Sequence, residues 1–138
     1  MEMTPKSKKG IMGLRNLGNT CFMNSGIQCI TSVDLLTHYF INKEYLPDIN
    51  RQNPIGTKGE LSEAYAKQIE KMWYGEEDSV APTVLKRAIG KFQPMFVGFE
   101  QHDSDELISY LLDGLHEDLN RVKIKPYTES KDYDGRED

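Results

Sequence analysis

The sequence has 138 residues, which is enough for one compact domain. Its 38% hydrophobic and 28% charged residues are typical of a globular protein, and no apolar run approaches the roughly 20 residues that a membrane helix needs. The net charge is −5, and residues 100–120 contain no Lys or Arg but the acidic residues Glu100, Asp103, Asp105, Glu106, Asp113, Glu117 and Asp118. This balance disfavours nucleic acid as a partner and favours a basic peptide or protein tail.

The N-terminal residues 1–10 carry lysines with no hydrophobic segment after them, so we expect a flexible tail and no secretory signal. The two cysteines, Cys21 and Cys29, are spaced to lie on one helix, too far apart to form a disulfide. A reducing compartment, the cytoplasm or nucleus, is therefore the default expectation. The sequence holds no Cys-x-x-Cys pair, so we expect no metal site, and nothing in it calls for a cofactor.

Helical periodicity dominates the first half of the chain. We predict a helix over residues 21–31 and a shorter one over 33–40, followed by an ordered loop over 42–58 that is rich in Pro, Asn and Gly. Residues 59–73 predict the clearest helix, because one apolar stripe runs along it: Leu61, Ala64, Tyr65, Ile69, Met72 and Trp73.

Two further helices are expected in the second half. Pro82 fits the first turn of one helix, and Pro94 ends it. The last helix is predicted from about Asp103 to about Val122, with Gly114 allowing a close helix approach and a core face formed by Leu107, Ile108, Leu111, Leu112, Leu115 and Leu119. Residues 123–138 read as a charged linker, and alternating strand patterns are almost absent.

Cys21 stands where a loop rich in Gly and Asn, residues 13–20, meets the first predicted helix. Unpaired N–H groups and the positive end of the helix dipole favour a thiolate there, and the thiolate is the nucleophile. Asn16 in the same loop could donate its side-chain amide to an oxyanion. The residues alone also fit a second interpretation, in which Cys21 is a small buried hydrophobe and the loop is only a turn and a cap.

The unbroken run from Gly13 to Ser25 resembles the cysteine box of the ubiquitin-specific proteases, which are papain-like deubiquitinating enzymes. The resemblance implies that Cys21 is the nucleophile and that Asn16 helps to form the oxyanion hole. It covers roughly residues 11–138. The runs Leu111–Val122, Lys125–Tyr127 and Asp134–Arg136 are most similar to the subgroup whose longer members carry DUSP and ubiquitin-like domains.

A second motif, residues 101–107, opens the last predicted helix. Acidic residues in a first turn complement the helix dipole, and Asp103 or Ser104 would serve as the N-cap. Three carboxylates within four residues repel one another unless a cation offsets them. The resemblance implies that Asp103 and Glu106 hold the arginines of the ubiquitin tail and that Gln101 lines the same channel. Asp105 departs from the glutamine usual in the family, which could alter one tail contact.

Each of the three histidines, His38, His102 and His116, is a candidate base for Cys21. His38 and His116 fall in amphipathic helices and are read as surface or core-edge residues. His102 occupies a motif position where the family also allows glutamine. The resemblance implies that the catalytic histidine and its Asp or Asn partner come from a later part of the domain.

We therefore expect a mainly α chain, the helical thumb (residues 11–122) of a papain-like α+β cysteine peptidase fold, without its β-rich palm and fingers. The whole enzyme would hydrolyse the isopeptide bond at the C-terminal glycine of ubiquitin, with ubiquitinated proteins as substrates. This chain alone is expected to be weak or inactive. Two alternatives stay open: a non-catalytic ubiquitin-binding module, and a helical interaction domain with a structural Cys21. Faces left uncovered would also favour self-association.

Overall fold

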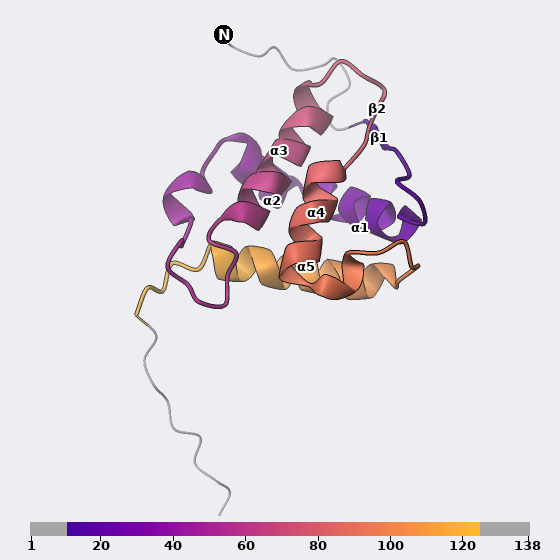
Figure 1. Cartoon of the computed structure of the whole chain (residues 1–138). Helices are drawn as coiled ribbons and strands as arrows, with labels where there is room; N and C mark the ends of the chain where they lie inside the picture. Colours follow the sequence, from indigo (N-terminus) through magenta and orange to yellow (C-terminus); the bar gives the residue numbers. More distant parts are fainter. Residues whose placement is uncertain (1–10, 125–138) are drawn as a thin grey trace, which may run out of the picture.

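A computed structural model describes residues 11–124 of the chain, and the expectations for residues 1–10 and most of 123–138 lie outside this range. The predicted mainly α class is confirmed, because five α-helices form most of the described structure (Figure 1). They are α1 (Cys21–Thr31), α2 (Asp34–Ile41), α3 (Glu60–Tyr74), α4 (Thr83–Phe92) and α5 (Ser104–Asp118). Shorter elements are β1 (Gly13–Leu14), β2 (Ser79–Val80) and two 3-10 turns, η1 (Leu46–Asp48) and η2 (Pro94–Phe96).

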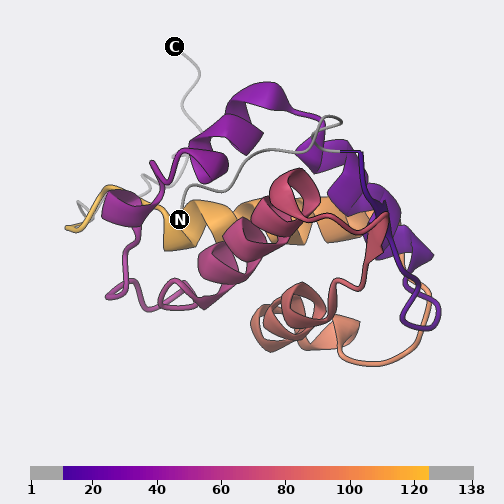
Figure 2. The same ribbon diagram turned by 90° about the horizontal axis from the view of Figure 1, so that it is seen from above.

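Helix α3 is the centre of the fold, since it contacts α2, α4 and α5. Seen from above, α3 lies between α2 and α4, with α5 running beneath it (Figure 2). The predicted apolar stripe of α3 is confirmed, because Leu61, Tyr65, Ile69 and Met72 are fully buried. Helix α5 contributes Leu107, Leu111 and Leu115 to the same core, and it also contacts α1.

The close approach expected at Gly114 is present. A Cβ atom at this position of α5 would clash with Leu61 Cδ2 and would lie 3.1 Å from Phe92 Cε1. Because no side chain fits there, the absence of a Cβ lets α5 pack directly against α3 and α4. This contact fixes the direction of α5, whose first turn carries the second sequence motif.

The last helix ends earlier than predicted, at Asp118 rather than near Val122. The Asp118 side chain is fully buried and accepts hydrogen bonds from the backbone and hydroxyl groups of Thr57 and Ser62. These bonds tie the end of α5 to the loop before α3, and the chain turns away afterwards. Asp118 therefore does not belong to the acidic surface that the sequence suggested.

One core prediction was wrong, because Leu112 on α5 is 43% exposed. On α2, Leu35 is 88% exposed. Helix α2 packs instead through Phe40 and through Thr37, whose buried hydroxyl donates to the Thr31 carbonyl at 2.7 Å. The short β1–β2 pair was also not predicted. It is parallel, with Gly13 opposite Ser79 and Leu14 opposite Val80.

Candidate active site

The loop before α1 is organised by the side chain of Asn16. Its Oδ1 accepts hydrogen bonds from Gly18 N at 3.0 Å, from Thr20 N at 3.1 Å and from Thr20 Oγ1 at 3.1 Å. Between them, Gly18 and Asn19 adopt left-handed backbone angles, with φ of 99° and 52°. The result is a tight turn that ends at Thr20, directly before Cys21.

These contacts also decide which way the Asn16 amide faces. Backbone N–H groups can only donate, so the atom that receives two of them must be the carbonyl oxygen. The Nδ2 donor is then left without a hydrogen-bond partner within the described part of the chain. Asn16 is exposed, so its NH2 group is available to a ligand. This is the state that an oxyanion donor requires.

Cys21 is the first residue of α1, and its side chain is exposed. The backbone N–H groups of a first helical turn have no partner within the helix, and the first turn of α1 contains no acidic residue to offset them. The helix dipole therefore presents its positive end to the sulfur, with no carboxylate in that turn to oppose it. The second cysteine, Cys29, lies in the last turn of the same helix and is also exposed.

The segment before Cys21 is held from two sides. On one side, Asn24 of α1 donates from Nδ2 to the carbonyls of Leu14 and Arg15, each at 3.2 Å. On the other, β2 pairs with β1, and Arg15 N donates to Val80 O at 2.9 Å. The loop is therefore fixed relative to both α1 and the chain that leads into α4.

Gln101 lies directly against the thiol. Its Nε2 is 3.4 Å and its Oε1 is 3.5 Å from Cys21 Sγ, so the flat amide faces the sulfur. The two residues meet because α1 and α5 cross closely at Gly26, where a Cβ would lie 3.2 Å from Ile108 Cγ1. The crossing is reinforced by a 2.9 Å hydrogen bond between the hydroxyls of Ser25 and Ser104.

The acidic residues of the second motif occupy the start of α5. Asp103 is the N-cap, and its Oδ1 accepts a hydrogen bond from Asp105 N at 2.9 Å. One carboxylate oxygen of Asp103 therefore caps the helix, while the exposed side chain leaves the other open. Glu106 is half-buried and Asp105 is exposed, both in the first turn. The structure thus joins Gln101 to Cys21 and places Asp103 and Glu106 within one turn beyond it.

None of the three histidines hydrogen-bonds to Cys21 within residues 11–124. The His38 ring lies on Trp73, with 5.6 Å between centroids, and its Nδ1 is 2.7 Å from Asp34 O. The ring of His102 packs edge-on against Phe22 and Phe96, at centroid distances of 5.4 and 5.0 Å. His102 therefore serves as a packing residue under the site. His116 is exposed on α5.

One contact at the site was not predicted from the sequence. Asn19 Nδ2 donates to the carbonyl of Phe99 at 3.0 Å, which joins the cysteine loop to the loop before α5. Phe99 is 71% exposed although it is aromatic. An aromatic residue in a polar, glycine-containing loop was the available hint, but its partner lies 80 residues away in the sequence.

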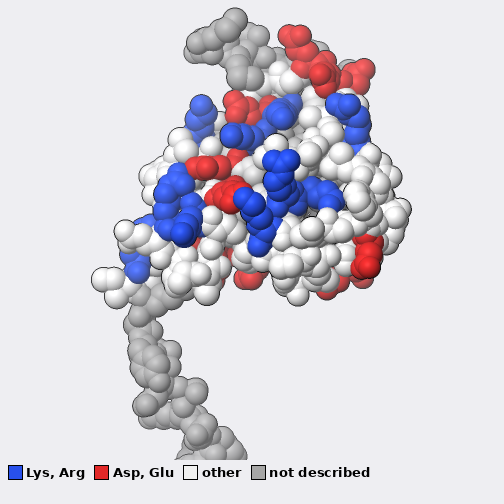
Figure 3. Space-filling model, viewed as in Figure 1, with Lys and Arg blue, Asp and Glu red and all other residues white. Residues whose placement is uncertain are grey.

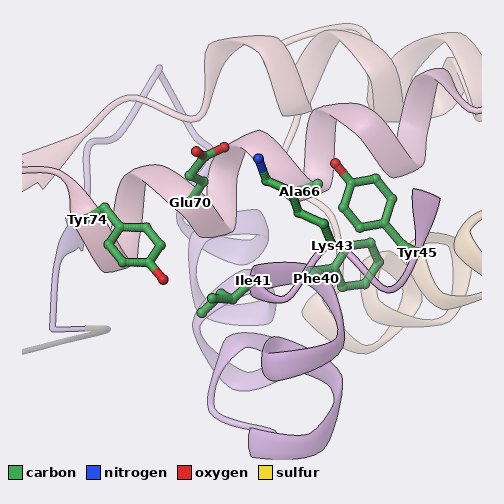
Figure 4. A pocket seen from close by; sticks show the side chains of 7 residues that line it. All are labelled: Phe40, Ile41, Lys43, Tyr45, Ala66, Glu70 and Tyr74. Atoms are coloured by element: carbon green, nitrogen blue, oxygen red, sulfur yellow. The ribbon is translucent and has the colours of Figure 1, made fainter. Parts of the chain in front are cut away.

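Two other features of the surface are separate from Cys21. A hollow of about 200 Å³ lies between the end of α2 and α3, and Figure 4 shows Glu70 and Lys43 between the rings of Tyr74 and Tyr45. Burial, followed by the charges of Glu70 and Glu63, raises the pKa of Tyr45. The hollow contains neither cysteine nor histidine, so it offers no thiol and no imidazole base. Figure 3 shows Lys and Arg side chains gathered over α3 and α4 on the face seen in Figure 1.

A charged cluster fixes the far end of α5. Arg121 donates to both carboxylate oxygens of Asp48, at 2.9 and 2.8 Å, and Tyr39 donates to Asp48 at 2.7 Å. The hydrogen bonds from Arg121 and then Tyr39 lower the pKa of Asp48, while burial and then the bond to Asp48 raise the pKa of Tyr39. This cluster joins α2, η1 and the end of α5, so its role is structural.

No group of His, Cys, Asp or Glu within residues 11–124 is arranged to hold a metal ion. No helix in the same range is both long and apolar enough to cross a bilayer.

Comparison with known proteins decides the family. Residues 12–136 match the family described as "Ubiquitin carboxyl-terminal hydrolase". The chain belongs to this family. Ubiquitin carboxyl-terminal hydrolase 4 of Rattus norvegicus is 55% identical over 135 residues, which cover 98% of this chain and 14% of the rat protein. Ubiquitin carboxyl-terminal hydrolase 32 of Homo sapiens is 54% identical over 132 residues, which cover 96% of this chain and 8% of the human protein.

The chain thus spans about a tenth of the length of these ubiquitin carboxyl-terminal hydrolases. Among solved structures, the SAGA DUB module of Ubp8, Sgf11, Sus1 and Sgf73 bound to ubiquitin aldehyde matches 85% of this chain and 26% of its own chain. The TM-score is 0.68 at 21% sequence identity. This match supports the predicted assignment of the fold to the helical part of a ubiquitin-specific protease.

Proposed function

We propose that this chain supplies the nucleophile side of the cleft in a cysteine-type deubiquitinase. The reaction is hydrolysis of the isopeptide bond between the C-terminal glycine of ubiquitin and a lysine of a ubiquitinated protein. The observation that carries the proposal is the contact between Cys21 Sγ and the Gln101 amide at the start of α1. The exposed thiol of Cys21 lies at this helix N-terminus, beside a loop in which Asn16 has a free amide donor.

The chemistry assigned to these residues follows their geometry. The Cys21 thiolate attacks the glycine carbonyl carbon, and the carbonyl oxygen becomes an oxyanion that Asn16 Nδ2 and a first-turn backbone N–H stabilise. The C–N bond then breaks, and the lysine amine leaves with a proton from a histidine. Water hydrolyses the thioester, which releases the ubiquitin carboxylate and restores the thiol. The electron pair of the broken bond stays on the amine nitrogen throughout.

The histidine in this scheme comes from outside residues 11–124. His38 and His102 are both engaged with aromatic side chains, and His102 supports the site by packing on Phe22. Removing one member of a nucleophile–base pair abolishes most of its activity. The chain alone is therefore proposed to be weak or inactive as a hydrolase while retaining its nucleophile.

The first turn of α5 is proposed to hold the ubiquitin tail. Asp103 has one carboxylate oxygen free after capping α5, and Glu106 follows within the same turn. Carboxylates bind the guanidinium group of arginine in a two-point, charge-assisted geometry. Arginines of the tail would pair with them and bring the scissile carbonyl to Cys21. Gln101, and Asp105 as a variable neighbour, would line the path between the two.

Two related expectations follow. Both cysteines are free thiols, which supports a reducing compartment, the cytoplasm or nucleus. The exposed apolar residues on α2 and α5, Leu35 and Leu112, support association with another surface, either a further part of the domain or a second copy.

The test uses ubiquitin that carries a thiol-reactive group in place of its C-terminal carboxylate. The chain and its Cys21→Ala and Cys29→Ala variants are incubated with it, and intact mass is measured over time. We expect one adduct that is lost only in Cys21→Ala. Cys29→Ala is a matched control, because Cys29 is an exposed thiol on the same helix. An adduct that persists in Cys21→Ala, or a folded chain that forms none, would overturn the assignment.

A further inference from the structure

A lysine on α4 binds the backbone of the loop that leads to the candidate site. Lys86 Nζ lies 3.4 Å from Phe96 O, 3.1 Å from Val97 O and 3.2 Å from Gly98 O. An ammonium group has three N–H donors, so these three consecutive carbonyls occupy all of them. Hydrogen bonds from a charged donor are stronger than neutral ones. Lys86 therefore fixes the backbone directly after η2.

The residue after these carbonyls rests on the cysteine loop. The Phe99 ring centroid is 5.7 Å from Lys86 Nζ, within the range of a cation–π contact. The same ring touches Gly18, where an added Cβ would lie 3.3 Å from Phe99 Cδ1. The Phe99 carbonyl accepts the hydrogen bond from Asn19 Nδ2 at 3.0 Å. The segment that Lys86 binds, residues 96–99, therefore packs against residues 18–19.

Apart from Val97, the side chains of this loop are not packed into the core. Val97 is 63% exposed and Phe99 is 71% exposed, and nothing lies within 4 Å of an added Cβ at Gly98. Val97 still packs against Gly90 of α4, where an added Cβ would lie 3.1 Å from Val97 Cγ2. Beyond Val97, apolar burial does little to fix residues 98–100, so polar contacts must hold them. Two residues after Phe99, Gln101 meets Cys21 Sγ.

We infer that Lys86 is a positioning residue for the site, acting through residues 96–101 to hold Gln101 against Cys21 and to seat the cysteine loop. This inference rests on the proposed function for its effect on reactivity, but its structural part does not. Lys91, five residues further along α4, gives the contrast, because it pairs with Glu60 at 2.8 Å and makes no hydrogen bond to this loop within residues 11–124. Lys86 and Lys91 lie on the same helix and carry the same charge, but Lys86 binds the loop carbonyls and Lys91 binds Glu60.

The experiment compares Lys86→Met, Lys86→Arg and Lys91→Met in the whole chain. Hydrogen–deuterium exchange measures how well the backbone of the loop is protected. The rate of adduct formation with ubiquitin carrying the thiol-reactive group measures the reactivity of the site. In Lys86→Met we expect faster exchange over residues 97–101 with unchanged exchange in α3. We also expect the adduct rate at saturating reagent to fall about tenfold or more, because small displacements of reacting groups are costly. The reagent concentration at half-maximal rate should change little, and Lys86→Arg should recover part of the loss.

The outcomes separate the two proposals. If the unaltered chain forms no adduct at Cys21, the proposed function fails, and the exchange data still judge the inference. If Lys86→Met exchanges like the unaltered chain over residues 97–101, or if Lys91→Met loosens them equally, the inference is overturned. Should Lys86→Met fail to fold, Phe99→Ala removes the exposed ring that links Lys86 to Gly18. The inference then requires slower adduct formation, and an unchanged rate refutes it.

Discussion

The side-chain amide of Gln101 lies flat against Cys21 Sγ, although the two residues are 80 positions apart in the sequence. The close crossing of α1 and α5 at Gly26 and the hydroxyl pair of Ser25 and Ser104 bring them together. The surroundings of Cys21 are therefore built by two helix N-termini, one carrying the thiol and the other the residues proposed to guide the substrate.

Cys21 should react faster than Cys29 with a small alkylating reagent such as iodoacetamide. Both thiols are exposed, but Cys21 lies at the N-terminal, positive end of the α1 dipole and Cys29 at its negative end, so negative charge at the sulfur during attack is stabilised only at Cys21. A dipole effect of about 1 kcal/mol corresponds to roughly a fivefold difference in rate. Alkylation followed by peptide mass analysis at pH 7 gives both rates in one sample. Equal rates would count against a nucleophilic role for Cys21.

Asp103→Asn should weaken binding of ubiquitin without destabilising the chain. Asn caps a helix about as well as Asp, so the bond from Asp105 N is kept while the charge is lost. We expect about a fivefold loss in affinity, the scale of one exposed ion pair. Asp103→Ala should lose the cap as well, at a cost of about 1 kcal/mol in unfolding free energy.

Fluorescence anisotropy with labelled ubiquitin and thermal unfolding measure the two effects separately. Asp113→Asn is the control, because Asp113 is exposed on the same helix, beyond its first turn. A loss of affinity in Asp113→Asn that matches the loss in Asp103→Asn would show a general charge effect and remove the proposed role of Asp103.

Asp118→Asn should destabilise the fold by about 2–3 kcal/mol. Both oxygens of this buried carboxylate accept hydrogen bonds, Oδ1 from Thr57 N and Oδ2 from Thr57 Oγ1 and from Ser62. An amide nitrogen at either position would face a donor instead of accepting from it. Chemical denaturation of the two proteins measures the difference. A change below about 0.5 kcal/mol, typical of a surface substitution, would contradict this account.

Tyr65→Phe should be neutral or stabilising near pH 7 and increasingly stabilising in alkali. Tyr65 is fully buried, and its hydroxyl has no hydrogen-bond partner within residues 11–124. Burial raises the pKa of this phenol in the folded chain. Above pH ~10 the Tyr65 phenol therefore ionises in the unfolded chain before it ionises in the folded chain, which stabilises the unfolded state. The folded protein then loses about 1.4 kcal/mol per pH unit through this group.

The Phe variant lacks this group, so the stability difference between the two proteins should widen as the pH rises above about 10. Urea denaturation at a series of pH values measures it, and the other tyrosines cancel because both proteins contain them. A difference that stays constant across this range would show that the Tyr65 hydroxyl is solvated in the folded state.

Local sequence patterns predicted the helices well. The first helix was predicted over residues 21–31 and is observed at Cys21–Thr31, because a polar loop and an apolar run meet there. Asp103 was one of two predicted N-caps, and the structure selects it. Strands β1 and β2 were missed because two residues are too few to show alternation.

Long-range contacts could not be predicted in this way. The early end of α5 depends on Asp118 meeting Thr57, and the position of Gln101 depends on a helix crossing. Lys86 resembles any solvent-facing lysine in the sequence, because its partners are backbone carbonyls that carry no side-chain signal. The roles of Asn16, Asp103 and Glu106 in catalysis and binding stay predictions drawn from the family resemblance.

The 80-residue separation of Cys21 and Gln101 has a consequence for synthesis of the protein. The ribosome releases the cysteine first, and at about 5–20 residues per second the partner loop and α5 follow several seconds later. Until then α1 cannot pack against α5, and the loop that Lys86 binds has not yet been synthesised. Cys21 of the nascent chain therefore has no Gln101 beside it until α5 docks against α1, so the surroundings of the thiol are completed late in synthesis.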